Sequence, residues 1–174
     1  MQSDSQMNLL KGLLAGAAAG LAASFVMGQF HAQFQNADSR PTRVAPARAD
    51  EDSTVKAASA LSRAVLRHKL TPAQKKLAGP LMDYAFGATL AGIYGMAVEL
   101  HPEFSAGRGV PFGMAVWLGA HVIAVPALGL SQPITKSPPR AETIEFGAHL
   151  VYGAVTESLR RLMRMGGFRN QAGQ

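Results

Sequence analysis

Four apolar segments, each long enough to cross a membrane, constrain the fold of this chain more than any other feature. They cover residues Leu9–Phe30, Gly79–Leu100, Val110–Leu130 and Thr143–Met163, which are 21 or 22 residues each. At a rise of about 1.5 Å per residue, a helix of this length crosses a hydrocarbon core of about 30 Å. Four such helices leave little polar surface to cover them in a chain of 174 residues. The sequence therefore predicts an all-α integral membrane bundle of four transmembrane helices.

A polar stretch separates the first two segments, so the mean hydropathy of the whole chain is only +0.08. Residues 36–52 mix Pro, Asp, Arg and Ala without apolar periodicity, which is typical of a flexible linker. Residues 53–66 place apolar side chains on one helical face and predict a short amphipathic helix, lying either in the head-group plane or on a soluble partner. Thr71 and Pro72 then supply the cap and first-turn proline of a helix that bends at Pro80 and continues into the second segment.

These patterns divide the chain into three regions. Residues 1–30 hold the N-terminal flank and the first transmembrane helix, residues 31–78 the polar linker with the amphipathic helix, and residues 79–174 the other three transmembrane helices with a basic tail. We expect the first segment to remain as a helix rather than to be cleaved as a signal peptide, because no clear small-x-small site follows it.

The chain is basic, with 17 Lys and Arg against 11 Asp and Glu and a formal net charge of +6. Because no interleaved aromatics or reading motif accompany these charges, we expect the lipid bilayer rather than nucleic acid as the partner, with the chain itself or another membrane protein as a further one. We assign the basic residues that flank the apolar segments to the membrane interface: Lys75, Lys76, Arg160, Arg161 and Arg164. There is no cysteine and no nucleophile elbow, phosphate loop or zincin helix, so we do not expect an enzyme.

Small residues recur within the apolar segments at helical spacing. In the first segment they follow one another every four residues, a spacing typical of a glycine zipper: Gly12, Gly16, Gly20, Ser24 and Gly28. Further small residues lie in and beside the second and third segments: Gly87, Gly95, Gly109 and Gly113. Such ridges let another backbone approach closely. The first ridge could contact a neighbouring helix of the same chain, a second copy, or a pore.

Ionisable residues inside the last two segments are the candidate functional site. His121 lies in the third segment, and Glu145, His149 and Tyr152 share one face of the fourth. Counted from the loop between the segments, the two histidines lie at similar depths, and Glu145 could orient the ring of His149 or hold its proton. Because ionisable groups are costly in hydrocarbon, the cluster marks a site. It could be a structural clasp, a proton or pH-linked site, or a ligand pocket. We expect no cofactor, although facing His121 and His149 could hold haem or a divalent metal.

The chain resembles the YagU-like family of bacterial inner-membrane proteins, a domain of unknown function. The resemblance is carried by an ordered pattern between Glu99 and Arg161: Glu99, Pro102, Gly109, Gly113, His121, Pro126, Gly129, Pro133, Glu145, His149 and Glu157. It implies four spans with both termini in the cytoplasm, and it assigns no reaction, cofactor or substrate. The count of basic residues instead favours a cytoplasmic long loop. We follow the resemblance, because Arg160, Arg161 and Arg164 directly adjoin the last span.

Two functional hypotheses follow. The first is a small inner-membrane protein of unassigned molecular function that responds to pH or protons through the His121, Glu145 and His149 cluster. The second is an accessory or assembly subunit that docks on a larger membrane complex through its glycine-rich first helix.

Overall fold

The computed structural model describes residues 2–36 and 53–171, so most of the predicted 36–52 linker lies outside the described residues. Every regular element in these two ranges is helical, as the sequence predicts. The elements are α1 (Gln2–Asn36), α2 (Ser53–Leu61), η1 (Ser62–Leu66), α3 (Pro72–Leu100), η2 (Pro102–Gly109), α4 (Val110–Val116), η3 (Trp117–Ala124), α5 (Val125–Ala127), η4 (Ile134–Lys136) and α6 (Pro139–Gln171).

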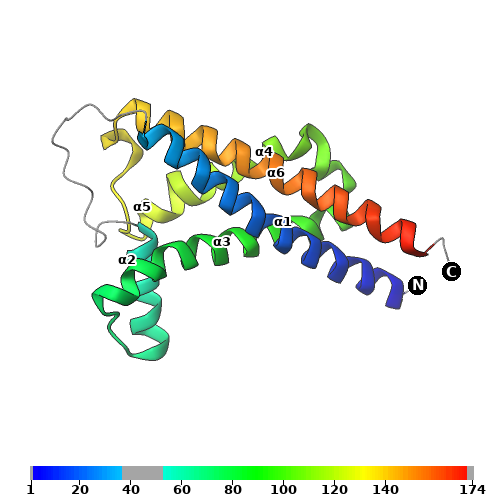
Figure 1. Cartoon of the computed structure of the whole chain (residues 1–174), viewed down its shortest axis with the longest axis horizontal. Coiled ribbons are helices and arrows are strands. Elements are labelled where there is room, and N and C mark those ends of the chain that lie inside the picture. The colour runs from blue at the N-terminus through cyan, green and yellow to red at the C-terminus, as the bar shows by residue number, and fades with distance from the viewer. Residues whose placement is uncertain (1, 37–52, 172–174) are drawn as a thin grey trace.

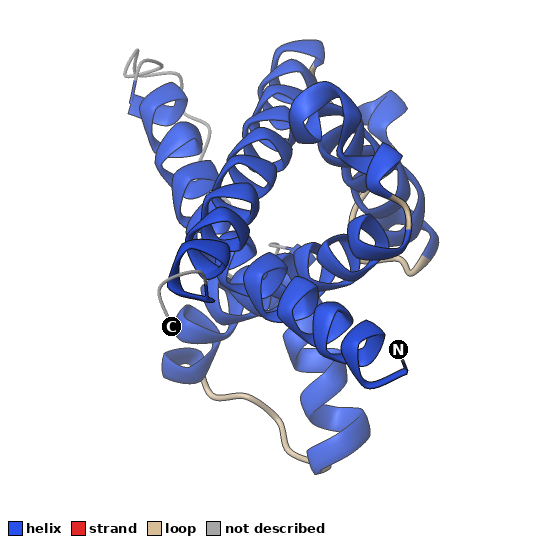
Figure 2. Ribbon diagram, turned by 90° about the vertical axis from the view of Figure 1, so that its right-hand side faces the viewer, coloured by secondary structure: helices blue, strands red, loops and turns tan. Residues whose placement is uncertain are grey.

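The long helical stretches run back and forth along the molecule (Figure 1). Helix α1 runs away from the end marked N, α3 returns towards it, the α4–η3–α5 stretch runs away again, and α6 returns. The start of α1 and the end of α6 therefore lie at the same end of the bundle. Figure 2, turned by 90°, shows the described residues as helices joined by loops, with no strand among them.

Three helical stretches of the described chain are long and apolar enough to cross a membrane, and they indicate a membrane protein. They are Ser5–Phe34, Pro72–Leu100 and Pro102–Ala127, with mean hydropathies of 1.7, 1.2 and 1.6. The predicted fourth span, Thr143–Met163, lies within α6 but is not among them. Helix α6 is long enough at 33 residues, but its charged side chains make it more polar than the other three.

The distribution of side chains is that of a bundle in lipid rather than in water. The buried apolar residues are mostly small, and among them Ala19, Ala23 and Ala91 are fully inaccessible. Large apolar residues such as Leu14 and Ile93 instead face outwards, with 60% and 52% of their surface exposed. Because lipid supplies no hydrophobic drive between helices, close contact of small residues is the stabilising interaction to expect inside such a bundle.

Helices α1 and α3 cross at a contact between backbones. A Cβ atom on Gly16 would overlap the carbonyl of Ala91, and one on Gly12 would lie 2.7 Å from the carbonyl oxygen of Gly95. Gly20 meets Ala91 and Gly87 in the same way, whereas a Cβ on Gly28 would have no neighbour within 4 Å. The first-helix ridge thus contacts a helix of the same chain over its first three glycines.

A second close crossing joins α4 to α6. A Cβ on Gly113 would overlap the carbonyl of His149, and one on Gly109 would overlap that of Gly153. Gly109 also has φ of +83°, a conformation that other residues adopt only with strain. These two contacts fix α6 beside the third apolar stretch, as expected for segments joined by a short loop.

The start of α3 follows the sequence prediction, and the predicted short helix before it is made of two elements. The Thr71 hydroxyl accepts from the Gln74 amide at 3.3 Å, and the Gln74 side chain accepts from the Thr71 amide at 2.8 Å, which completes a capping box ahead of Pro72. The short helix predicted over residues 53–66 is present as α2, which ends at Leu61, followed directly by the π-helical turn η1, and its amphipathic role stays a prediction. Val55 is buried against α3, whereas Leu61 is exposed.

Candidate functional site

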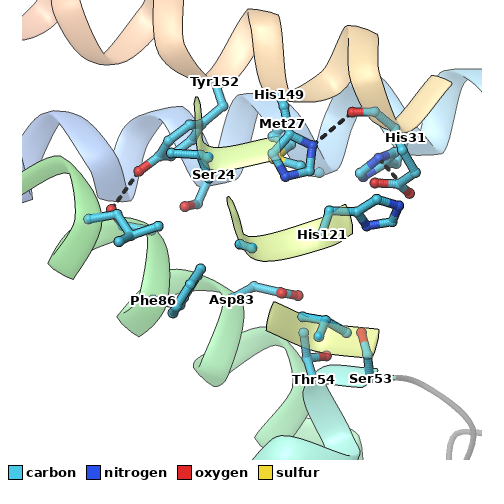
Figure 3. Close-up of a pocket in the computed structure, with 17 residues that line it drawn as sticks. Ser24, Met27, His31, Ser53, Thr54, Asp83, Phe86, His121, His149 and Tyr152 are labelled. Atoms are coloured by element: carbon cyan, nitrogen blue, oxygen red, sulfur yellow. Dashed lines mark hydrogen bonds and ion pairs between the residues drawn. The ribbon is translucent and has the colours of Figure 1, made fainter. Parts of the chain in front are cut away.

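A partly open cavity of about 400 Å³ lies where α1, α2, α3, η3 and α6 meet (Figure 3). Three histidines and two carboxylates line it: His31, Asp83, His121, Glu145 and His149. Each of the four long stretches contributes at least one of them. The cavity is therefore a place where ionisable groups from distant parts of the chain share one space inside the bundle.

His121 projects into this cavity from an irregular stretch of helix. The stretch Trp117–Ala124 is π-helical, and the Val125 amide donates to the carbonyl of Ala120, five residues earlier. Pro126 follows at once and has no N–H to continue the α-helical pattern. Single π-helical turns recur at functional sites because they re-aim side chains. Here, Nε2 of His121 lies 3.0 Å from Oε2 of Glu142, the nearest carboxylate on α6.

His149 is held by the backbone of its own helix. Its Nδ1 lies 2.8 Å from the carbonyl oxygen of Glu145, so Nδ1 carries the proton and donates it. This leaves Nε2 to gain or lose a proton. The His149 ring faces His121, with 5.9 Å between the ring centroids. The two histidines at similar predicted depths are therefore neighbours across the η3–α6 contact.

The carboxylate of Glu145 contacts the first helix. Its Oε1 lies 3.2 Å from Nε2 of His31 on α1, at an angle that does not give a hydrogen bond. Both side chains are partly buried. The sequence suggested that Glu145 would orient His149 or hold its proton. The structure differs: the Glu145 carbonyl orients the His149 ring, and the carboxylate pairs with His31 (Figure 3).

Tyr152 forms the wall of the cavity next to α3. Its hydroxyl donates to the carbonyl oxygen of Gly87 at 2.6 Å. Gly87 has no side chain to obstruct this approach, and Ser24 of α1 lies against the same position. The Tyr152 ring also contacts Phe112, with 5.8 Å between the ring centroids. Tyr152 thus connects α6 to α3 at the cavity wall.

A separate charged network lies towards the end where α6 finishes. Glu157 is 1% exposed and accepts hydrogen bonds from Arg160, Arg161 and the Tyr94 hydroxyl, which lies 3.0 Å away. Glu157 thus pairs with arginines three and four residues later in its own helix. Arg160 itself is 5% exposed, so it serves this network more than the membrane interface to which we assigned it.

Arg164 extends the network to α3. Its Nε and one terminal nitrogen each donate to a carboxylate oxygen of Glu99 at 2.8 Å. Arg161 also donates to the Ser105 carbonyl at 2.7 Å, so it reaches η2. Lys75 and Lys76, the other predicted interface residues, lie near the start of α3 at the opposite end of that helix. The network is a clamp between helix ends, away from the cavity.

The remaining positions of the sequence pattern are turn and cap residues. Pro102 begins η2, and Pro133 precedes η4. Gly129 has φ of +69° and donates its amide to the Pro126 carbonyl at 2.9 Å, which closes the turn after α5. These residues shape the connections on either side of the stretch that carries His121.

Sequence reasoning missed three acidic or histidine residues of the site: His31, Asp83 and Glu142. All three lie at the ends of apolar segments, where polar residues are common and attract no notice. A signal was present for Asp83, because it is a carboxylate inside a helix apolar enough to span a membrane. Within the described residues, no group of three or more His, Asp or Glu side chains is arranged to hold a metal ion.

Comparison with known proteins places the chain in a family. No curated protein and no solved structure matches it. The model of a family described as a protein of unknown function (DUF1440) matches residues 45–158, which includes α2, α3, the His121 stretch and the His149 part of α6. The narrower resemblance to YagU-like proteins stays a prediction. The chain belongs to the DUF1440 family of proteins of unknown function.

Proposed function

We propose that this chain is a multi-pass inner-membrane protein that responds to pH by protonation of the histidines in its cavity. One observation supports the proposal above the others. The cavity brings His31, His121 and His149 from three different helical stretches within reach of Glu142 and Glu145. Imidazole is the side chain that changes charge near neutral pH, so a change of pH changes the charge inside the bundle.

The geometry gives this change of charge a mechanical consequence. Two protonated rings at the 5.9 Å separation of His121 and His149 repel each other by about 3 kcal/mol, taking an effective dielectric constant of about 20. Glu142, Glu145 and Asp83 offset part of this repulsion. An energy of this size is comparable to a helix contact, so acidification should loosen the η3 stretch from α6.

The chain contains one tryptophan, and it lies at the contact that should move. Trp117 begins η3, four residues before His121, and its ring meets Phe146 of α6 edge to face with 4.9 Å between centroids. Loosening of η3 from α6 would expose Trp117 and change its fluorescence. The protein therefore carries its own reporter for the proposed response.

The test is the fluorescence of Trp117 in the full-length protein in lipid nanodiscs, between about pH 5 and about pH 8, where imidazole titrates. We expect a sigmoidal change that His149→Gln abolishes. His101→Gln is the matched control, because the His101 side chain is 61% exposed and pairs with Glu103 outside the cavity. A flat profile in the unsubstituted protein, or an unchanged profile in His149→Gln, contradicts the proposal.

We further propose that α6 is a fourth crossing helix and that both termini face the cytoplasm. The return of α6 to the end where α1 begins supports an even number of crossings (Figure 1). Because the chain has no cysteine, single cysteines can report topology. Ser5→Cys and Met165→Cys should react with an impermeant thiol reagent only after the cytoplasmic side is opened, and Arg67→Cys should react from the outside. Labelling of Ser5→Cys and Met165→Cys from opposite sides would contradict four crossings.

The alternative function is that of an accessory subunit docking through the first helix. The structure leaves one part of the predicted ridge for such a partner. Gly12, Gly16 and Gly20 are occupied by α3, whereas Gly28 is exposed and a Cβ atom there would have no neighbour within 4 Å. Gly28 also lines the cavity, so a leucine there fills part of it. A Gly28→Leu variant should then lose a co-purifying partner. Recovery of the protein alone from native membranes in mild detergent would contradict this alternative.

A further inference from the structure

We infer that the cavity binds a small organic cation, a quaternary or protonated amine on an apolar body, and that protons compete with this ligand. The inference rests on the proposed function and names the ligand class of the same cavity. It is carried by the composition of the cavity wall, by its size, and by the positions of its charged side chains.

The charge of the wall changes sign with protonation. The described lining residues include two carboxylates, Asp83 and Glu145, and three histidines, but neither lysine nor arginine. With neutral histidines the formal charge of these five side chains is therefore −2, and with three protonated histidines it is +1. A cation is attracted in the first state and repelled in the second. Glu142 behind His121 adds a further negative charge in the first state.

The charged groups surround the space from several sides. Asp83 projects from α3 towards the stretch that carries His121, while His31 and Glu145 lie on α1 and α6 (Figure 3). His149 on α6 completes the set of titratable groups that face the cavity. A ligand between Asp83 and Glu145 would meet one carboxylate from each of two helices, which suits a single positive centre.

The rest of the wall suits an organic rather than an inorganic cation. Met27, Phe86 and Leu90 supply apolar surface, and Tyr152 adds a second aromatic ring. Aromatic faces attract organic cations, and a volume of about 400 Å³ lies within the range of small-molecule sites. A bare divalent ion would need six or more oxygen ligands at about 2.0–2.6 Å, and no such group of side chains exists in the described residues.

The test uses benzyltrimethylammonium, a cation that cannot lose its charge, so any effect of pH on binding comes from the protein. Isothermal titration calorimetry on the full-length protein in nanodiscs should show binding at about pH 8 that weakens at least about tenfold at about pH 5. Benzenesulfonate, which has an aromatic ring and the opposite charge, should not bind at about pH 8. Equal binding of the two probes would overturn the inference.

Variants locate the site. Asp83→Asn and Glu145→Gln should each lower the affinity for benzyltrimethylammonium about tenfold or more at about pH 8. Glu103→Gln is the matched control, because Glu103 is 68% exposed and lies outside the cavity. If either variant fails to fold, the other still reports. Unchanged affinity in the folded variants would overturn the inference.

The outcomes separate this inference from the proposed function. A pH-dependent Trp117 signal without benzyltrimethylammonium binding would overturn the cation site and leave the pH response standing. Binding that is equally tight at about pH 5 and about pH 8 would overturn the competition between protons and ligand. Binding that weakens with acid while Trp117 stays silent would support the cation site and contradict the proposed movement.

Discussion

Glu145 contacts His31 through its carboxylate, at 3.2 Å, and His149 through its backbone carbonyl, at 2.8 Å. One residue thus joins the first helix to the last and also fixes which ring nitrogen of His149 is free to titrate. The division of roles has a simple cause. The ring of a histidine can reach the backbone carbonyl of the residue four positions earlier in its helix. The side chain of that earlier residue, here Glu145, is then available to contact a neighbouring helix.

Removal of the Glu145 charge should weaken the contact between α1 and α6. We expect Glu145→Gln to lower the free energy of unfolding by about 1 kcal/mol, since the partly buried contact between the Glu145 carboxylate and the His31 ring is lost. Thermal unfolding in detergent measures this, with Glu103→Gln as the exposed control. Equal melting temperatures for the two variants would show that the pair with His31 contributes nothing.

A large side chain should have different effects on stability at the two ends of the α1 glycine ridge. Gly16→Leu has to displace the α3 backbone at Ala91, whereas Gly28→Leu meets nothing within 4 Å. Overpacking of a tight contact costs about 1–3 kcal/mol or more, so Gly16→Leu should unfold at a clearly lower temperature while Gly28→Leu stays close to the parent. A similar loss in both variants would contradict the α1–α3 crossing.

The clamp between Arg164 and Glu99 should depend on its bidentate hydrogen bonding. Arg164→Gln removes both 2.8 Å hydrogen bonds and leaves Glu99 with Arg160 at 3.7 Å, so we expect a loss of about 2–3 kcal/mol. Arg164→Lys keeps the charge but loses one of the two hydrogen bonds, so it should lower the free energy of unfolding by an intermediate amount. Chemical denaturation of Arg164→Gln and Arg164→Lys, with Lys69→Gln at an exposed position as the control, tests this order of stabilities. A lysine variant as stable as the parent would show that charge alone matters.

Pro126 should set the direction of His121. Pro126→Ala restores the missing N–H and lets the π-helical stretch return to α-helix, which turns His121 away from His149. We expect the pH response of Trp117 to be lost while stability is kept or increased. Pro111→Ala is the control, because Pro111 lies in the first turn of α4, where proline replaces no hydrogen bond. Retention of the full pH response in Pro126→Ala would contradict this role.

The sequence was sufficient for the features that depend on local chemistry. Apolar length predicted the three membrane-spanning stretches, and the order of Thr71 and Pro72 predicted the start of α3. Counting residues from the short loop placed His121 and His149 at similar depths, and their ring centroids lie 5.9 Å apart in the structure.

The rest depends on which helices become neighbours, which periodicity does not encode. His31 pairs with Glu145 only because α1 lies beside α6. Asp83 lines the cavity only because α3 also borders it. The fourth span was predicted from apolar residues alone, whereas the charges that make α6 polar serve contacts with Glu99 and His31. Those contacts are tertiary, so no window of the sequence reveals them.

The central claim is that the histidines of the cavity titrate as a coupled group near neutral pH. Nuclear magnetic resonance of ¹⁵N-labelled histidines in nanodiscs, with each signal assigned by a single His→Gln substitution, tests it most directly. We expect the ¹⁵N signals of the cavity histidines to change with pH, and His121→Gln to shift the change seen at His149. If the signals of His31, His121 and His149 stay constant between about pH 5 and about pH 8, the cavity is a fixed clasp and the account is wrong.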